Sequence, residues 1–344
     1  MKLCLIGDLH FGEKGDSEKY NRQILELLEF AANESDKRGV TKCFQFGDYF
    51  DNRSRINVET INYALEGAQL LNERFDEVFT IVSNHDIYYR DRLDVTSLKI
   101  LKPYITVIEE ATLLDEGNII ATPWIVNGKQ WDDMIKMSEE AGSRFCFGHF
   151  ELNGFLVNDM YEMEHGYSPK ELRHFEAVYT GHYHSPQKKD NIQYLGTPIP
   201  ITMNEANQSH GIYFLDTDTG DIEFVEYEKV KVVSVAYEDF DSVLDLDPEN
   251  SYIRVEFPDD LEDETLITDV QNILQEKGFE FKVKYTDTKA KQIMEADVES
   301  IEEVENIDAV VMNHIKTAKE IDGIDNSLLN ELYQEAKDRG GRNA

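Results

Sequence analysis

Cysteine is scarce in this chain of 344 residues: Cys4, Cys43 and Cys146 are the three that occur, each inside a short apolar run. Three thiols in predicted buried strands do not make a disulfide framework, so we expect them to act as small hydrophobic residues in a reducing compartment. Long apolar runs are also missing, because no stretch reaches the ~18 residues that suggest a membrane helix. No charged-then-apolar leader opens the sequence. We therefore expect neither membrane insertion nor secretion, and a cytoplasmic protein.

Basic residues are the third shortage, with 34 Lys and Arg against 69 Asp and Glu and a formal net charge of −35. The acidic excess is spread over both halves: −18 over residues 1–230 and −17 over residues 231–344, where 29 acidic and 12 basic side chains occur. Such a surface repels DNA phosphates, although divalent cations bound in a site invert the potential locally. If the chain acts on DNA, we expect it to bind DNA weakly alone and to depend on a basic partner for most of its DNA affinity.

Five short runs of strand-forming residues each stop at a residue type that binds metals or transfers protons. Each run closes with Gly or Ser and leads into Asp, Asn or His; they span Leu3–His10, Cys43–Asp51, Val78–Asp86, Phe145–His149 and Val178–His184. This pattern predicts buried strands that feed loops, and loops at the carboxyl ends of strands are where α/β proteins build sites. One such run means little by itself, but five in order indicate a functional site.

The predicted ligands combine oxygen and imidazole donors without any thiolate. They are Asp8, His10, Asp48, Asn84, His149, His182 and His184. This mixture suits Mn, Fe or Zn better than a calcium cage built from oxygens alone. Seven ligands are too many for one ion that must admit a substrate, whereas two ions sharing a carboxylate can use them all. Two metals about 3.5–4 Å apart can clamp the attacking and leaving oxygens of a phosphoryl transfer.

Ordinary explanations exist for single members of this set, since a lone histidine is more often a core or surface residue than a ligand. Five of the nine histidines, however, lie in the five motifs and in the expected order, which makes a functional role the better interpretation for these five. We interpret the others as surface or packing residues: His165, His174, His210 and His314. Glu151 and Asn153 lie close to His149 in sequence and could shape the site, but their spacing does not require it.

Together the motifs resemble the signature of calcineurin-like metallophosphoesterases. The matching elements are Asp8-x-His10, Gly47-Asp48-x-x-Asp51, Asn84-His85-Asp86, Gly148-His149 and Gly181-His182-x-His184. Within that superfamily the chain resembles the SbcD-type nuclease subunit of the double-strand-break repair complex. Residues 148–155 and 194–198 are especially similar to the recombination endonuclease subunits of T-even-type phages. The motif match covers roughly residues 1–200, and beyond them the similarity is one of layout.

The resemblance implies how seven ligands would be shared between two divalent ions, most plausibly Mn with Mg as a substitute. Asp8, His10 and His184 would hold one ion, and Asn84, His149 and His182 the other, with Asp48 bridging the two.

Three further positions follow from the same resemblance. His85 would lie beside the scissile phosphate, stabilising the transition state and assisting the leaving oxygen, as an imidazole with a near-neutral pKa can. Asp51 would orient a ligand, although some relatives carry at this position a histidine that also touches the phosphate. The third motif usually opens with Gly, whereas this chain has Ser83, a change that could alter the tight turn before Asn84.

The length allows about two domains of ~150 residues, and strands alternating with helices predict two mixed sheets sandwiched between helices. The resemblance implies the same α/β class of fold, a four-layer α/β/β/α sandwich. We expect helices at about 17–38, 58–75 and 95–101, and strands at 106–109, 118–122, 144–148, 177–180, 192–195, 211–216 and 221–227, the last two joined by a hairpin turn. We expect three parts: a nuclease domain over 1–229, a capping domain over 230–288, and a linker with C-terminal helices over 289–344.

The predicted capping domain lacks every metal motif. It reads as strand, strand, helix, strand, over Val230–Tyr237, Tyr252–Phe257, Glu262–Lys277 and Glu280–Tyr285. In the family the equivalent unit helps admit and orient DNA; a plain stabilising α+β appendage is the alternative.

The end of the chain predicts a pair of short helices. Apolar residues recur at steps of three or four at Val304, Ile307, Val311, Ile315 and Ala318, and a second stripe contains Leu328, Leu329, Leu332 and Ala336. Such helices could pack back on the body, or dock on a partner as helices do in a groove or coiled coil. In SbcD-type proteins this segment clasps the coiled-coil base of an SbcC-type ABC ATPase.

The helix predicted at 58–75 carries more apolar surface than one side of a lone helix needs. Its apolar residues and one neighbour are Ile56, Ile61, Tyr63, Ala64, Leu65, Leu70 and Leu71. In the family this region and the helix near 95–101 form a two-fold bundle across a homodimer. Ordinary packing against the sheet is nearly as well supported.

We therefore interpret the chain as a Mn-dependent DNA exonuclease and endonuclease subunit. It would work as a homodimer within a heterotetramer with an SbcC-type ATPase, in the host cytoplasm if a phage encodes it. The alternative is a stand-alone phosphatase or cyclic-nucleotide phosphodiesterase, which the first 200 residues and the acidity equally allow. A non-enzymatic scaffold is disfavoured because every ligand position is filled.

Overall fold

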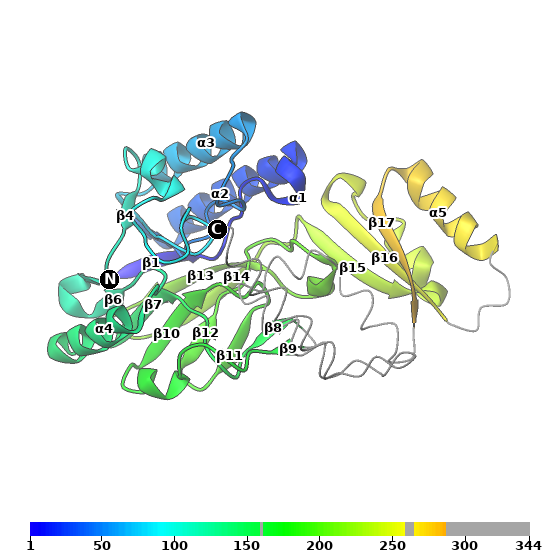
Figure 1. Ribbon diagram of the computed structural model, residues 1–344. Coiled ribbons are helices and arrows are strands. Elements are labelled where there is room, and N and C mark those ends of the chain that lie inside the picture. Colours follow the sequence, from blue (N-terminus) through cyan, green and yellow to red (C-terminus); the bar gives the residue numbers. More distant parts are fainter. Residues whose placement is uncertain (159–160, 259–264, 287–344) are drawn as a thin grey trace, which may run out of the picture. The chain divides into compact units, whose positions relative to one another are not determined.

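Two six-stranded sheets lie face to face in a computed structural model of the chain, which describes residues 1–158, 161–258 and 265–286 (Figure 1). The first sheet has the strand order β14-β13-β1-β2-β3-β4 and the second has β11-β12-β10-β7-β6-β5. Helices cover the outer faces (Figure 1). This arrangement confirms the predicted four-layer α/β/β/α fold.

The first sheet has four parallel strands, β1 to β4, and at one edge β13 pairs antiparallel to β1 and β14 antiparallel to β13. Its strands are β1 (Lys2–Ile6), β2 (Lys42–Gln45), β3 (Glu77–Ile81), β4 (Thr106–Ile108), β13 (Gly211–Asp216) and β14 (Ile222–Glu226). Both faces of β1 are buried, with Leu3 and Leu5 in the core between the sheets and Cys4 and Ile6 in the core under the helices. Strands buried on both faces read as continuous apolar runs, which is why the sequence signals them so clearly.

Two capped helices cover the outer face of the first sheet: α2 (Glu18–Arg38), with Ser17 as N-cap, and α3 (Val58–Arg74), with Asn57 as N-cap. Both match the predicted helices within one residue. The helix expected at 95–101 is instead a single short 3₁₀ segment, η1 (Ser97–Leu101), begun by Thr96. The brief α1 (Glu13–Asp16) contains left-handed residues and links the first motif to α2.

The second sheet repeats this plan with four parallel strands and an antiparallel strand at each edge. Its strands are β5 (Thr112–Leu114), β6 (Ile119–Ala121), β7 (Phe145–His149), β10 (Ala177–Gly181), β11 (Gln187–Lys189) and β12 (Ile192–Tyr194). The helix α4 (Gly128–Ala141), which we did not predict, buries Trp131 and Met134 and is capped by Asn127. The predicted hairpin of β13 and β14 is confirmed.

Aromatic side chains fill the space between the sheets. The ring of Phe147 lies 4.9 Å from that of Phe44 and 5.3 Å from that of Phe46, measured between centroids. A close-packed interior of this kind holds the strand ends, and therefore the loops that follow them, in fixed positions. The described connections include β8 (Leu156–Asn158), β9 (Tyr161–Glu162), η2 (Asp115–Gly117), η3 (Pro169–Leu172) and η4 (Met203–Glu205).

Residues 231–286 build a three-stranded sheet with one helix. The elements are β15 (Lys231–Ala236), η5 (Tyr237–Val243), η6 (Pro248–Asn250), β16 (Ser251–Pro258), α5 (Thr265–Lys277) and β17 (Glu280–Thr286), with the strand order β15-β16-β17. A separate hydrophobic cluster that includes Ile253, Val255, Phe257 and Leu274 forms their core. The predicted order of strand, strand, helix, strand is confirmed, and the division at residues 229 and 288 stays a prediction.

The helices predicted over 289–344 lie outside the described residues. Among the residues that are described, no helix is both long and apolar enough to cross a membrane.

Candidate metal centre

The predicted site residues follow the carboxyl ends of strands in both sheets. Their positions are Asp8 and His10 after β1, Asp48 after β2, Asn84 and His85 after β3, His149 at the end of β7, and His182 and His184 after β10. Since β1, β2 and β3 are parallel neighbours, and β7 and β10 likewise, the loops of each sheet meet at one edge. Residues separated by as many as 176 positions therefore share one site.

Asp8, His10 and His184 form a first cluster, with one potential ligand atom of each within 4.8 Å of the others. Asp8 is fully buried, and its Oδ2 accepts the backbone N–H of His182 at 2.8 Å. Its Oδ1 is buried as well and has no hydrogen-bond partner in the described part of the chain. The orientation of Asp8 is thus fixed through one oxygen, and the other is left for a ligand.

Asp48, His149 and His182 form a second cluster on the same distance criterion. Nδ1 of His149 donates to the carbonyl of Phe46 at 2.7 Å, so its Nε2 carries the lone pair when the ring is neutral. This is the arrangement that orients metal-binding histidines in proteins. Beside this cluster, Asn84 is 1% exposed, and neither polar atom of its side chain has a hydrogen-bond partner among the described residues.

The carboxylate of Asp48 lies between the two clusters. Its Oδ2 is 3.2 Å from Nε2 of His149 and 3.7 Å from Nε2 of His10. Two ligands of one ion, each ~2.0–2.2 Å from it, are spaced about this far apart. One oxygen of Asp48 is therefore close to a histidine of each cluster.

Three of these residues have left-handed backbone conformations, which residues other than glycine rarely adopt. They are His10 (φ 49°), Asp48 (φ 45°) and His182 (φ 95°). Strain of this kind is found mainly at functional sites, where the surrounding structure holds it in place. Gly181 shows how closely the two sheets approach here, because a Cβ atom at that position would lie 2.3 Å from Oδ1 of Asp8.

Burial and mutual charge set the protonation of these side chains. Burial raises the pKa of Asp8 to about 7, and burial together with His184 lowers the pKa of His10 to about 3. Burial alone would lower the pKa of His149, but Asp48 and Asp8 raise it to about 9. The result is a His149–Asp48 ion pair next to a neutral His10, which keeps the lone pair of one ring nitrogen.

These donors fit divalent cations. Buried polar atoms normally find partners, yet Oδ1 of Asp8, Nε2 of His10 and both polar atoms of Asn84 have none among the described residues. Oxygen and imidazole groups without thiolate are suitable ligands for hard and borderline metals.

His85 and Asp51 lie at the edge of the first cluster. Nδ1 of His85 donates to the backbone carbonyl of Asp51, and its backbone N–H donates to Oδ1 of Asp48 at 3.2 Å. The Asp51 carboxylate is 3.4 Å from Nδ1 of His10. Although burial opposes it, the Asp48 and Asp51 carboxylates raise the pKa of His85 above its ordinary value.

Ser83, the departure from the usual glycine, connects two of the site loops. Its hydroxyl accepts the backbone N–H of Asp48 at 2.6 Å and donates to Oδ2 of Asp86 at 2.5 Å. The Asp86 carboxylate also accepts the backbone N–H groups of Tyr49 and Phe50. The turn before Asn84 is therefore tied to the loop that carries Asp48.

Sequence reasoning missed two other residues beside the histidines. Trp124 follows β6, and its ring centroid lies 5.2 Å from that of His182 and 5.9 Å from that of His149. Glu205 is 2% exposed and lies 3.9 Å from Nδ1 of His184. Glu151, which the sequence suggested as a neighbour, is 3.9 Å from Nε2 of His182. Neither Trp124 nor Glu205 belongs to a motif, so no local pattern pointed to them.

The other described histidines keep their ordinary interpretation: His210 is buried and bonds the carbonyl of Thr197, while His165 and His174 are exposed. All three cysteines are free and buried, as expected.

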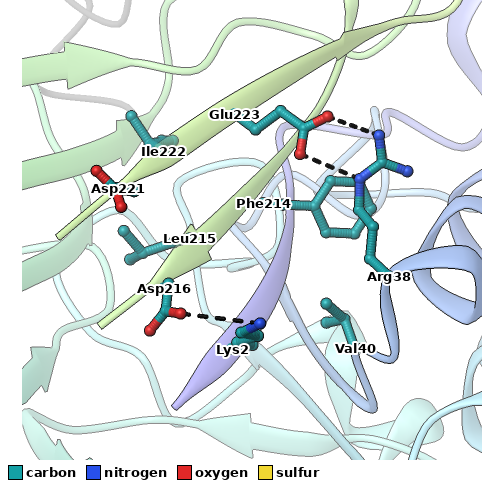
Figure 2. Close-up of a pocket in the computed structure, with 9 residues that line it drawn as sticks. All are labelled: Lys2, Arg38, Val40, Phe214, Leu215, Asp216, Asp221, Ile222 and Glu223. Carbon is teal, nitrogen blue, oxygen red and sulfur yellow. Dashed lines mark hydrogen bonds and ion pairs between the residues drawn. The ribbon is translucent and has the colours of Figure 1, made fainter. Parts of the chain in front are cut away.

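The cavity drawn in Figure 2 lies elsewhere, where β1 begins, and none of its nine labelled residues is a predicted ligand. Both of its cations are already engaged. Nζ of Lys2 lies 3.9 Å from Oδ2 of Asp216, and the Arg38 guanidinium makes two hydrogen bonds to Glu223 and stacks on Phe214. This cavity of about 340 Å³ carries no chemistry that we can assign.

Comparison with known proteins places the chain in a family. Exonuclease subunit 1 of Enterobacteria phage T4 is 32% identical over 230 residues, which cover 65% of this chain and 67% of that protein. The chain matches no protein-family model.

Two solved structures are more distantly similar. They are a dimetal phosphatase from Danio rerio (14% identity, 62% of this chain and 91% of that chain, TM-score 0.37) and Yfce, a phosphoesterase from E. coli (11% identity, 66% and 98%, TM-score 0.30). The identity to the phage protein, taken with the two clusters, leads to one conclusion. The chain belongs to the family of phage exonuclease subunit 1, the SbcD-type nuclease subunits, and is a hydrolase whose structure brings together two clusters of residues that could each hold a metal ion.

Proposed function

We propose that this chain is a metal-dependent DNA exonuclease and endonuclease subunit that hydrolyses phosphodiester bonds in recombination and double-strand-break processing. The observation that carries the proposal is the position of the Asp48 carboxylate, 3.2 Å from His149 and 3.7 Å from His10. A carboxylate in this position can serve two ions at once. The similarity to a protein named as an exonuclease subunit supports DNA as the substrate.

In this proposal the two clusters hold one divalent ion each, and Mn is the preferred metal. Asp8, His10 and His184 are the ligands of the first ion, Asn84, His149 and His182 those of the second, and Asp48 is shared. When bound, such a pair supplies electrostatic stabilisation at the phosphate and lowers the pKa of a water. The mixture of oxygen and imidazole donors supports Mn, and Mg is the runner-up.

His85 is proposed as the general acid. Its Nδ1 is engaged by the carbonyl of Asp51, so Nε2 is the atom that can reach a leaving oxygen. The raised pKa of His85 favours the protonated ring near neutral pH, which is the form that donates a proton. Asp51 is proposed as a positioning residue, because its carboxylate faces Nδ1 of His10 and its carbonyl holds His85.

The test of the chemistry uses a diester and a monoester with the same leaving group. With added Mn, we expect hydrolysis of bis-p-nitrophenyl phosphate, complete loss with a chelator, and much slower hydrolysis of p-nitrophenyl phosphate. Faster hydrolysis of the monoester would favour the stand-alone phosphatase, the alternative that the net charge of −35 allows. Hydrolysis that survives the chelator would contradict the metal centre.

DNA binding is proposed to depend on a partner, an SbcC-type ABC ATPase with a coiled coil. The acidic surface repels DNA, and residues 289–344 carry the apolar stripes that would dock on the ATPase. A chain truncated after Thr288 should keep diester hydrolysis, because every proposed ligand precedes residue 185. It should lose ATP-stimulated cleavage of duplex DNA; co-purification of the truncated chain with the ATPase would contradict this docking site.

The proposed homodimer uses the surface around α3 and η1. Many of the apolar residues of α3, such as Ala64 and Leu71, pack inside the monomer, which weakens the expectation. Exposed apolar residues do remain nearby: Val58 on α3 is 74% exposed, and Ile100 on η1 is 40% exposed. A monomer in light scattering at high micromolar concentration, with and without the ATPase, would count against the dimer.

A further inference from the structure

Trp124 connects the metal centre to a second cavity. Its ring borders those of His182 and His149, and its backbone N–H donates to the carbonyl of Val82 at 2.7 Å. That bond ties the loop after β6 in the second sheet to the end of β3 in the first. The half-buried indole is therefore held in place beside the second cluster.

The cavity that Trp124 helps to line has a volume of about 300 Å³ and lies between the end of β6 and α4. Its walls are mainly apolar, from Trp124, Pro123, Ile125 and Met137, while the exposed Glu110 and Asp133 are among its polar lining groups. Among the described residues that line it, none is Lys, Arg or His. The volume is at the lower end of the range for small-molecule sites.

This lining excludes a phosphate and favours a flat, neutral group. Two carboxylates repel a phosphate, but they accept hydrogen bonds from exocyclic amino groups such as those of adenine, cytosine and guanine. Aromatic side chains stack on the faces of nucleobases in proteins that bind single strands. A diester at the metal centre, one indole away, has such a base attached to its sugar.

We infer that this cavity, the Trp124 pocket, takes one nucleobase of the substrate strand, stacked on Trp124, while the neighbouring phosphate is at the metal centre. The inference rests on the proposed nuclease function and deepens it. Trp124 would then be a specificity-determining residue that separates nucleotide diesters from simple ones.

The first test compares two diesters with one leaving group. The p-nitrophenyl ester of deoxycytidine 5′-phosphate carries a base, and methyl p-nitrophenyl phosphate does not. For Trp124→Ala we expect the ratio of kcat/KM for the nucleotide ester to that for the methyl ester to fall roughly 5- to 100-fold, the range that loss of one stacked base gives. Trp124→Phe should keep most of the ratio, because the ring can still stack. Met137→Trp, which fills the pocket from α4, should lower it.

Equal losses on both esters in Trp124→Ala would overturn the inference, since they would mean that the indole merely supports His182 and His149. An unchanged ratio in both Trp124→Ala and Met137→Trp would also overturn it, because the base would then lie elsewhere.

A second test needs neither metal nor turnover. The chain has two tryptophans, so Trp131→Phe leaves Trp124 as the remaining indole. Deoxyadenosine, which has no phosphate, should quench its fluorescence in the presence of a chelator, and 2-deoxyribose should not. Failure of the protein to hydrolyse either diester would sink the nuclease proposal, whereas absence of quenching by deoxyadenosine would sink the pocket alone.

Discussion

The metal centre and the unit formed by residues 231–286 differ in the polarity of their buried side chains and in the strain of their backbone. In the centre, carboxylates and imidazoles are buried, several of their atoms have no hydrogen-bond partner within the described part of the chain, and three non-glycine residues have left-handed backbones. Among the described residues of 231–286, left-handed backbone occurs at Gly278 alone, and no buried side-chain polar atom lacks a partner. Its core is a cluster of apolar side chains such as Ile253 and Phe257.

This difference indicates which residues serve catalysis and which stabilise the fold. Unsatisfied buried groups and strained backbone lower stability, so the centre depends on the sheets around it. The smaller unit has no such strained or unpartnered groups among its described residues. It contacts α2 through polar pairs, Lys19 with Glu280 at 2.7 Å and Gln23 with Asn250 at 3.1 Å, and its Val232 and Tyr252 join the hydrophobic cluster under the helices. Substitutions in the centre should change turnover, and substitutions in the core of residues 231–286 should change stability.

The largest effect should come from Asp48→Ala. Because this residue is the proposed shared ligand, its loss should remove hydrolysis of bis-p-nitrophenyl phosphate below detection and lower metal content by mass spectrometry. Activity near that of the wild type would break the assignment of Asp48 to both ions.

His85→Ala should separate chemistry from metal binding. General acid assistance contributes about 10²–10⁴-fold, so kcat should fall by that range. The metal content should stay at the wild-type value, since His85 is proposed to bind no ion. A loss of half of the metal would mean that His85 is itself a ligand.

Phe257→Ala should show the opposite behaviour. Phe257 is 1% exposed and stacks on Tyr237, and a large-to-small change in a core costs about 3–5 kcal/mol of unfolding free energy. Chemical denaturation should report that loss, while kcat of the folded protein should match the wild type. A fall in kcat without a loss of unfolding free energy would contradict the assignment of Phe257 to stability alone.

Ser83→Ala should have an intermediate effect, because it removes the acceptor for the N–H of Asp48 and one donor to Asp86. Groups that orient ligands contribute about 10- to 100-fold to metal affinity or activity. Isothermal titration with Mn should show the loss, and Ser83→Ala, Asp86→Asn and the double variant should have similar effects, because the two residues act together. Additive losses would mean that Ser83 and Asp86 act separately.

A further effect concerns pH. The proximity of Asp48 and Asp8 raises the pKa of His149 to about 9, against the effect of burial. Metal binds the deprotonated ring, so below that pH a proton must be displaced. Apparent Mn affinity should therefore rise between pH 7 and pH 9, by up to about 10-fold per unit for one proton, and level off above. An affinity that is constant over this range would show that His149 is not protonated in the metal-free centre.

The sequence predicted the strands well because each is a local pattern: an apolar run buried on both faces that ends at a loop. It also predicted the capped α2 and α3. It missed α4, although Asn127 followed by Trp131, Met134 and Ser138 at helical spacing was a usable signal.

The sequence could not predict contacts between segments that are far apart along the chain. The hydrogen bond that the Ser83 hydroxyl accepts from the backbone N–H of Asp48 joins residues 35 positions apart. The sequence motif suggested only a change in the turn, whereas the structure has a link between two loops. The approach of Glu205 to His184 and of Trp124 to His182 depends on how strands of the second sheet are ordered, which no local pattern encodes.

Anomalous scattering from a crystal grown with Mn tests the binuclear centre most directly. We predict two peaks, one among Asp8, His10 and His184 and one among Asn84, His149 and His182, about 3.5–4 Å apart as in other two-metal sites, with Asp48 between them. A single peak, or a second peak away from Asp48, would contradict it.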